Sequence, residues 1–141
     1  MADVHSREVR SYNMSRIKGK DTKPELLVRK YLHFRGLRYR LHVKDLPGKP
    51  DMVFPKYHTV LFVHGCFWHG HAGCPYYRLP QSNTGFWEEK ISGNTSRDQK
   101  HAAALREKGY RVLTAWECSF KNKNNRTAFL EELYNEITNE R

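Results

Sequence analysis

Long apolar runs are missing from this sequence of 141 residues. No stretch approaches the roughly 18 consecutive apolar residues that a membrane-spanning helix needs, so we expect no role at a membrane. The first ten residues, MADVHSREVR, are charged from the third position and lack the apolar segment of a secretory signal. The sequence therefore predicts a cytoplasmic protein.

Cysteine is also scarce, with three residues in the whole chain. An odd number of cysteines cannot all pair within one chain, which argues against a disulfide scaffold and favours a metal site or a free thiol. Disorder is disfavoured because 13% of the residues are aromatic. The length lies within the usual range for one domain, so we expect a single domain over residues 1–141.

Positive charge is abundant and unevenly distributed. Lys and Arg number 25 against 15 Asp and Glu, which gives a net charge of +10. Residues 1–50 hold 13 Lys or Arg and 5 Asp or Glu, whereas the last sixteen residues hold two Arg and four Glu. A basic N-terminal third favours a polyanion, most commonly nucleic acid, as the partner. The alternative is a solvated basic face without a partner.

Helical and strand periods alternate along the chain and predict an α/β fold, with a mixed central sheet flanked by helices. Thr22 and Gly36 mark the start and end of a first helix. The continuously apolar run at residues 60–63 is typical of a strand buried on both faces. The predicted elements are an irregular basic arm at 1–20, a helix at 22–36, strands at 37–43, 52–54 and 59–63, a structured loop at 64–80, a short segment at 86–91, a helix at 95–108, a strand at 110–116 and a C-terminal helix within 121–141.

The loop after the third predicted strand carries a set of soft metal ligands. Cys66, His69, His71 and Cys74 lie in this loop, and Cys118 follows the last predicted strand. Thiolates and imidazoles select zinc, and three cysteines with one histidine fill a closed tetrahedral site of the structural kind. The alternative is three buried thiols that never meet, since free cysteine packs as a small hydrophobic residue.

A second set of residues suits metal-assisted hydrolysis. Asp51 follows a Pro-Gly turn at the start of a strand, where a carboxylate can hold Mg²⁺ at the edge of a sheet. Glu25, His64, His69 and Asp98 could converge on it, and histidines would then move protons beside a bound metal. Each carboxylate also has a purely structural interpretation, in which Asp51 caps a turn, Glu25 serves its helix dipole and Asp98 is solvated.

Two pairs of adjacent aromatic residues, Phe67-Trp68 and Phe86-Trp87, lie in or beside the loops. Such pairs commonly cover a hydrophobic core. In a basic protein they also suit a wedge that enters between base pairs and unstacks them, and Met14 in the basic arm could act from the other groove.

These motifs resemble the very-short-patch repair (Vsr) endonucleases, a family that is similar to restriction endonucleases in fold. The sequences HGCFWH at 64–69 and LPGKPD at 46–51 carry most of the resemblance, which extends over residues 1–118. Further matching segments are 1–4, Asn13-Met14, Asp21-Thr22, Glu25, Phe86-Trp87, 89–91, Asn94, Arg97-Asp98, Gly109, 111–113 and 116–118.

The resemblance implies a restriction-endonuclease-like α/β fold with a loop stapled by zinc. It implies a Mg²⁺-dependent enzyme that nicks one DNA strand 5′ of the thymine at T:G mismatches, which arise by deamination of 5-methylcytosine. The nick starts very short patch repair. The implied partners are mismatched double-stranded DNA and repair-pathway proteins, and we expect a monomer that acts at the bacterial nucleoid.

The resemblance also implies a role for each site residue. Asp51 would bind Mg²⁺ together with the backbone oxygen of Val63, and His64 and Glu25 would contact metal-bound water and the scissile phosphate. His69, oriented by Asp98, would be the acid or base. The implied zinc ligands are Cys66, His71, Cys74 and Cys118, and the implied wedge residues are Phe67, Trp68 and Trp87, with Met14 entering from the minor groove.

The implied organisation is a single nuclease domain with three parts: a DNA-contacting arm at 1–20, a catalytic core with the zinc site at 21–120, and a C-terminal helix at 121–141. Two other functions fit the residues. One is a zinc-stapled module that binds mismatched or branched nucleic acid without catalysis. The other is a related nuclease that cuts both strands at a specific sequence.

Overall fold

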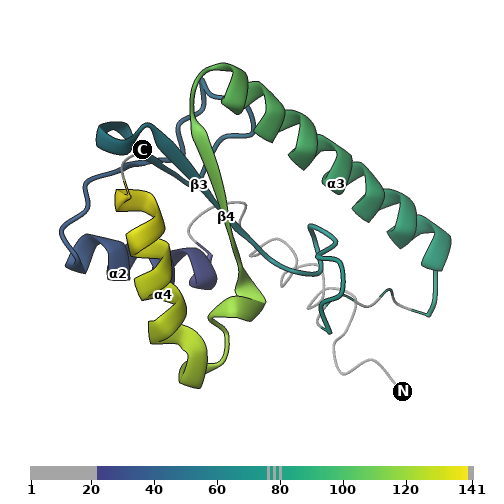
Figure 1. Cartoon of the computed structure of the whole chain (residues 1–141). Coiled ribbons are helices and arrows are strands. Elements are labelled where there is room, and N and C mark those ends of the chain that lie inside the picture. Colours follow the sequence, from purple (N-terminus) through teal and green to yellow (C-terminus); the bar gives the residue numbers. More distant parts are fainter. Residues whose placement is uncertain (1–21, 76, 78, 80, 140–141) are drawn as a thin grey trace, which may run out of the picture.

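The computed structural model describes residues 22–75, 77, 79 and 81–139. Its elements run in the predicted order of helix, three strands, helix, strand and helix (Figure 1). The basic arm at 1–20 lies outside the described residues. The elements are α2 (Lys23–Phe34), β1 (Arg40–Leu41), β2 (Met52–Phe54), β3 (Thr59–His64), α3 (Thr84–Glu107), β4 (Arg111–Trp116) and α4 (Lys123–Thr138), with short 3-10 turns at Pro55–Tyr57 and Glu117–Ser119.

The four strands form one mixed sheet in the order β1-β2-β3-β4. β1, β2 and β3 pair antiparallel, whereas β3 and β4 pair parallel, with Thr59 opposite Arg111 and His64 opposite Trp116. A parallel pair needs a crossover between its strands, and α3 supplies it. The predicted α/β class with a mixed sheet between helices is therefore confirmed.

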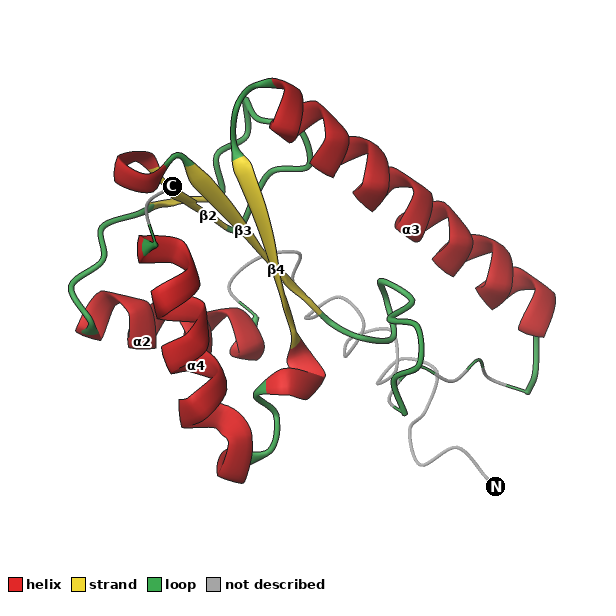
Figure 2. Cartoon of the chain, viewed as in Figure 1, coloured by secondary structure: helices red, strands yellow, loops and turns green. Residues whose placement is uncertain are grey.

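The larger core lies between the sheet and the α2/α4 layer (Figure 2). Thr22 caps α2 by accepting a hydrogen bond from the Glu25 amide, and Pro24 stands in the first turn, where no amide hydrogen is needed. Alternate residues of β3 and β4 point to this face, because side chains alternate along a strand. The buried members include Val28, Leu32, Phe54, Leu61, Leu113, Phe120, Leu133 and Ile137.

The opposite face of the sheet is covered by α3, with a smaller core of Val53, Val60 and Leu105 (Figure 2). Val60 and Leu61 are both fully buried, although they point to opposite faces of the sheet. The prediction of a strand covered on both sides at residues 60–63 is thus confirmed.

The structure differs from the predicted element bounds at two places. The strand predicted at 37–43 is reduced to Arg40–Leu41, because Leu37 is still bonded to the end of α2 and His42 turns into the left-handed region with φ of 50°. The short segment at 86–91 and the helix at 95–108 form one continuous helix, α3. Its interior Gly93 weakens the helix only modestly, which is why the chain does not break there. In addition, no helix among the described residues is both long enough and apolar enough to cross a membrane.

The turn before Asp51 is packed tightly against α3. Gly48 has φ of +75°, and a Cβ added there would lie 2.8 Å from the Cβ of His101. Gly36, with φ of +90°, has open space around its Cβ position. An alanine at Gly36 would therefore be destabilised only by the left-handed backbone conformation. An alanine at Gly48 would be destabilised by that conformation and by a steric clash with His101.

We predict that Gly48→Ala lowers the free energy of unfolding by about 1–3 kcal/mol more than Gly36→Ala, which should itself cost about 1–2 kcal/mol. Urea unfolding followed by circular dichroism would measure both variants. Equal costs at the two glycines would show that the turn does not depend on close packing against α3.

Candidate active site and metal-ligand clusters

The parallel pairing of β3 with β4 brings two chemically active segments to one end of the sheet. His64 is opposite Trp116 in the register. The polypeptide continues beyond the end of each of these two strands. Cys66 follows His64 by two residues, and Cys118 follows Trp116 by two residues. Segments 52 residues apart in the chain therefore leave the sheet side by side.

Four soft ligands converge just beyond this end. One ligand atom from each of Cys66, His71, Cys74 and Cys118 lies within 4.8 Å of the others. The Cys118 Sγ is 3.4 Å from the His71 Nδ1, and the His71 ring stacks on Trp116. Of the two histidines that the sequence offered, His71 belongs to this group, whereas His69 belongs to another.

Burial decides the protonation of these sulfurs in the absence of a metal ion. Burial raises the pKa of the Cys66 thiol to about 12, and it also raises the pKa of Cys118. Neutral thiols would be poor ligands, but a metal ion binds the thiolate and so displaces the proton. Three sulfurs and one imidazole, all within reach of one ion, fit zinc in a structural site.

The second group consists of two carboxylates, Glu25 and Asp51, and one histidine, His42. Glu25 is 2% exposed, and its Oε2 lies 3.2 Å from the Arg29 Nη1 and 3.0 Å from the His42 Nε2. One ligand atom from each of Glu25, His42 and Asp51 lies within 4.8 Å of the others. The group brings together the helix α2, the end of β1 and the start of β2.

Asp51 is held at the head of β2 by the backbone of β3. The amide of Val63 donates a hydrogen bond of 2.7 Å to the Asp51 Oδ2. Burial is the main cause that raises the pKa of Asp51 to about 7; the facing Glu25 carboxylate acts in the same direction, whereas the Val63 amide acts against it. Two carboxylates that face each other in this way fit a hard divalent cation, which would remove their mutual repulsion.

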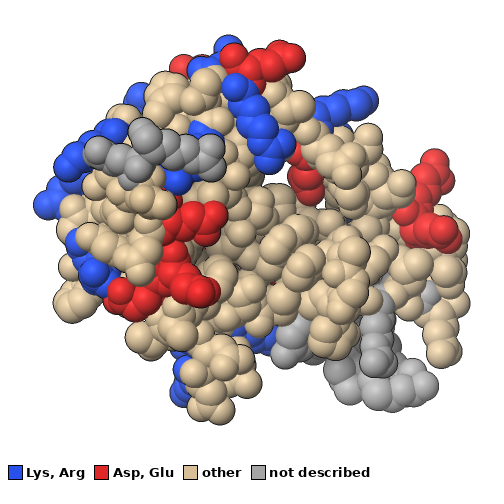
Figure 3. All heavy atoms as spheres, in the orientation of Figure 1, with Lys and Arg blue, Asp and Glu red and all other residues tan. Residues whose placement is uncertain are grey.

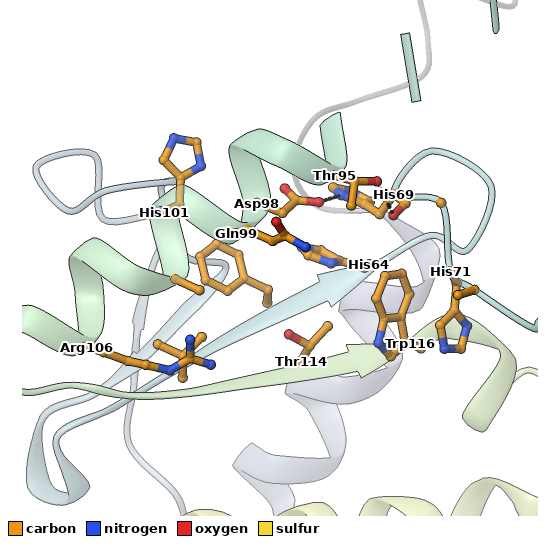
Figure 4. A pocket seen from close by; sticks show the side chains of 15 residues that line it. His64, His69, His71, Thr95, Asp98, Gln99, His101, Arg106, Thr114 and Trp116 are labelled. Atoms are coloured by element: carbon orange, nitrogen blue, oxygen red, sulfur yellow. Dashed lines mark hydrogen bonds and ion pairs between the residues drawn. The ribbon is translucent and has the colours of Figure 1, made fainter. Parts of the chain in front are cut away.

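The third group consists of two stacked histidines and an aspartate (Figure 4). The rings of His64 and His69 are nearly parallel, with centroids 3.7 Å apart. The Asp98 Oδ2 lies 2.7 Å from the His69 Nδ1, so that Asp98 fixes the orientation of this ring. Burial first, and His69 second, lower the pKa of His64 to about 4, so His64 is neutral near pH 7. No hydrogen-bond partner among the described residues reaches its buried Nδ1.

One face of α3 holds the loop that carries these ligands. Asn94 donates a hydrogen bond of 2.8 Å to the Trp68 carbonyl, and Thr95 donates one of 3.3 Å to the His69 carbonyl. Gly70 approaches the same face closely, since a Cβ added there would lie 2.7 Å from Ile91. The loop at 65–74, which has no regular structure, is therefore fixed to α3 by hydrogen bonds and packing.

The aromatic pairs gather beside this loop. Phe67, Trp68 and Trp87 contact one another edge to face, with ring centroids 5.2–5.9 Å apart. All three are partly exposed rather than buried, and Phe86, which contacts Trp87, is 60% exposed. The cluster thus offers apolar rings to solvent and does not close a core.

Two cavities lie beside the histidine pair. A cleft of about 400 Å³ is lined by Glu25, Val63, Trp68 and His69, among others, so that one residue each of the carboxylate group, the histidine pair and the aromatic cluster borders it. A second cavity of about 430 Å³ lies between α3 and the sheet and is lined by His64, His69, Asp98 and Arg106, among others (Figure 4). His69 borders both cavities.

Acidic side chains form one group over α4 in the face shown in Figure 3, and others lie near the two ends of α3. Lys and Arg side chains lie along the left edge and at the top of the same view, where α3 joins β4. The acidic residues of α4 are Glu131, Glu132 and Glu136. A polyanion would be repelled from the α4 surface and would approach the molecule elsewhere.

The structure brings most of the sequence-predicted residues together, but in three groups. Asp51 joins Glu25, His64 and His69 join Asp98, and the cysteines join His71. The contact of Val63 with Asp51 runs through its amide rather than its carbonyl. Met14 lies outside the described residues. Sequence reasoning missed His42, because it occupies a polar position of an apparently alternating strand and meets Glu25 only through the fold.

The mixed sheet flanked by helices has the architecture of the restriction-endonuclease-like fold. Residues 2–74 match the family "DNA mismatch endonuclease Vsr", and the chain belongs to this family. The protein is therefore a DNA-cleaving hydrolase, and its substrate is DNA.

Similar proteins cover nearly the whole chain. The type II nicking enzyme V.NmeAIP of Neisseria meningitidis is 50% identical over 123 residues, which cover 87% of each chain. The type II nicking enzyme V.XorIIP of Xanthomonas oryzae is 51% identical over 86% of this chain and 89% of the relative. The DNA mismatch endonuclease Vsr of Escherichia coli is 42% identical over 90% of this chain and 81% of the relative.

The raised pKa of Asp51 predicts a pH dependence of cation binding. Below its pKa of about 7 the carboxyl holds a proton in the metal-free protein, and a divalent ion must displace that proton. We expect the apparent affinity for Mg²⁺ to fall about tenfold for each pH unit below 7 and to level off above pH 8.

Calorimetry at pH 6, 7 and 8, in two buffers that differ in protonation enthalpy, would measure both the affinity and the protons released. Asp51→Asn should abolish this binding, and Asp45→Asn at an exposed loop position should not change it. An affinity that is constant from pH 6 to pH 8 would contradict the prediction.

Proposed function

We propose that this endonuclease nicks one strand of duplex DNA 5′ of the thymine in T:G mismatches, such as those left by deamination of 5-methylcytosine, and so starts very short patch repair. The observation that carries the proposal is one cleft bordered by Glu25 of the carboxylate group, His69 of the histidine pair and Trp68 of the exposed aromatic cluster. The names of the relatives add support, since one is a mismatch endonuclease and two are nicking enzymes.

In this proposal Asp51 holds a catalytic Mg²⁺, with the backbone oxygen of Val63 as a second donor. The bound ion would stabilise negative charge on the phosphate in the transition state. Glu25, which faces Asp51 from α2, would orient the water that attacks the phosphate. The chemistry of the donors fits this role, because carboxylate and carbonyl oxygens are the ligands that Mg²⁺ takes.

The histidine pair would exchange protons with the reacting groups and donate a hydrogen bond to the phosphate. Asp98 bonds to the Nδ1 of His69 and thereby leaves the Nε2 of His69 for proton exchange with a reacting oxygen. His64 is neutral at pH 7, so it would donate a hydrogen bond to the scissile phosphate without bringing a full charge. The aspartate acts through His69, as a positioning group.

The exposed aromatic cluster would detect the mismatch. Phe67, Trp68 and Trp87 would enter between base pairs from one groove, and Met14 in the basic arm would enter from the other. Unstacking costs a few kcal/mol and is least costly at a mismatch, so a wedge discriminates without reading every base. The positive charge of the chain would supply affinity for the DNA backbone, which should weaken as salt increases.

We also propose a structural zinc ion held by Cys66, His71, Cys74 and Cys118. Its role would be to fix the loop at 65–74, on which the histidine pair depends. The whole chain, 1–141, would form a single nuclease domain that works as a monomer, with a DNA-contacting arm at 1–20, a catalytic core at 21–120 and a C-terminal helix at 121–141. Repair-pathway proteins would then process the nick.

A binding module without catalysis is disfavoured, because the family to which the chain belongs consists of endonucleases. Cleavage of both strands is disfavoured because two relatives are named as nicking enzymes and a monomer with one active site needs to cut only one strand.

The proposed activity is tested with a duplex that contains one central T:G mismatch, in several flanking contexts, with Mg²⁺ or EDTA. We expect a Mg²⁺-dependent nick 5′ of the thymine and none in the matched T:A duplex. Asp51→Ala should reduce cleavage by at least about a thousandfold while DNA affinity stays within about threefold, because basic side chains rather than the metal hold the backbone.

Asp45→Ala, at an exposed position six residues before Asp51, is the matched control and should cleave normally. Mismatch binding without a nick in any context would favour the binding module, and double-strand cleavage of the matched duplex would favour the restriction-type alternative.

The zinc proposal predicts about one zinc ion per chain in the purified protein. Cys66→Ser and His71→Gln should lose this zinc and lower the melting temperature by 10 °C or more, since a loop without regular structure depends on its metal. His69→Gln should keep the zinc, because His69 lies in the neighbouring group. Metal analysis by mass spectrometry and thermal melts would measure both effects, and a wild-type melting temperature in Cys66→Ser would refute a structural role.

A further inference from the structure

His42 is the one member of the carboxylate group for which the proposed function has no role. Its Nε2 lies 3.0 Å from the Glu25 Oε2, and a ligand atom of His42 lies within 4.8 Å of both Glu25 and Asp51. Only 19% of its side chain is exposed. An imidazole is therefore built into a site that otherwise offers oxygen ligands.

The backbone holds His42 in this position. Continuing the antiparallel register of β1 with β2 places His42 opposite Asp51, and the His42 amide donates a hydrogen bond of 3.2 Å to the Asp51 carbonyl. The left-handed conformation of His42, with φ of 50°, ends β1 at this residue. The same hydrogen bond thus ties the histidine to the segment that carries the metal-binding carboxylate.

We propose that His42 is a direct nitrogen ligand of the catalytic cation and that the site consequently prefers Mn²⁺ to Mg²⁺. This inference rests on the proposed function, because it assumes a cation at Asp51. Mg²⁺ is bound almost wholly through oxygen, whereas first-row transition ions take imidazole readily. Two carboxylates and an imidazole on one face of a site are a mixed donor set, which favours the transition ion.

The separation of the donor atoms agrees with this assignment. Neighbouring ligands on one octahedral ion, each at about 2.1 Å from the metal, lie about 3.0 Å apart. The His42 Nε2 and the Glu25 Oε2 have this separation. Glu25 also contacts Arg29, so one positive group already neutralises it, and the carboxylate does not depend on His42 for its charge balance.

The alternative is that His42 only orients Glu25 through a hydrogen bond. His42→Gln separates the two roles, because a glutamine amide can still donate to Glu25 but removes the imidazole nitrogen. His58→Gln is the matched control, since His58 has the same φ of 50° but stacks on Tyr110, away from the three ligand groups.

The test uses the purified full chain with its native zinc content, loaded with Mn²⁺ and studied by pulsed electron paramagnetic resonance. We expect the wild-type and His58→Gln proteins to show modulation from an imidazole ¹⁴N, and His42→Gln to lose it. In parallel titrations, the dissociation constant for Mn²⁺ should rise about tenfold in His42→Gln, while that for Mg²⁺ stays within about twofold.

Retention of the nitrogen signal in His42→Gln, or an equal change in affinity for both ions, would overturn the inference. So would the absence of an imidazole signal from the wild-type protein, a result that needs no variant to fold. Asp51→Ala separates a failure of the proposed catalytic site from a failure of the role proposed for His42. If Asp51→Ala still binds Mn²⁺ with wild-type affinity, the proposed catalytic site itself is wrong, whereas loss of binding there with an unchanged signal in His42→Gln removes only the role of His42.

Discussion

The parallel pairing of β3 with β4 is the constraint on which the rest of the site depends. It places His64 opposite Trp116, so that the segments after β3 and β4 leave the sheet side by side and Cys66 lies close to Cys118. The loop between β3 and α3 then returns to the same place and contributes His69, which borders the cleft. The proposed catalytic residues His64 and His69 and the soft ligands therefore occupy one end of the sheet because a single strand pair ends there.

Electrostatics give the three ligand groups different properties. Burial leaves the thiols neutral and keeps His64 uncharged, while in the carboxylate group it leaves Asp51 with a pKa of about 7. The cysteine group and the carboxylate group each gain from a cation, whereas the histidine pair is organised by Asp98. Neighbouring groups at one edge can thus serve separate tasks, because desolvation acts on acids and bases in opposite directions.

Local sequence signals predicted the order and class of the elements, since helix caps and apolar periods act over a few residues. They also identified the soft ligands and the acidic residues, because these chemical types stand out in any context. They failed where distant contacts decide. The strand predicted at 37–43 stops at Leu41 because His42 adopts a left-handed turn, and the role of His42 beside Glu25 arises only when β1 meets α2. Spacing alone also left the choice between His69 and His71 open; the family resemblance implied His71, and the fold groups His71 with the cysteines.

The contacts of α3 fall on one stripe of the helix, at Ile91, Asn94, Thr95, Asp98, His101 and Leu105. Each position in a helix turns by about 100°, so inserting or deleting one residue within 91–105 would rotate part of this stripe away from the loop. Changes in chain length during evolution should therefore accumulate between the last cysteine of the loop and the start of α3, or beyond α4, while the length of this inner segment of α3 stays constant among active homologues.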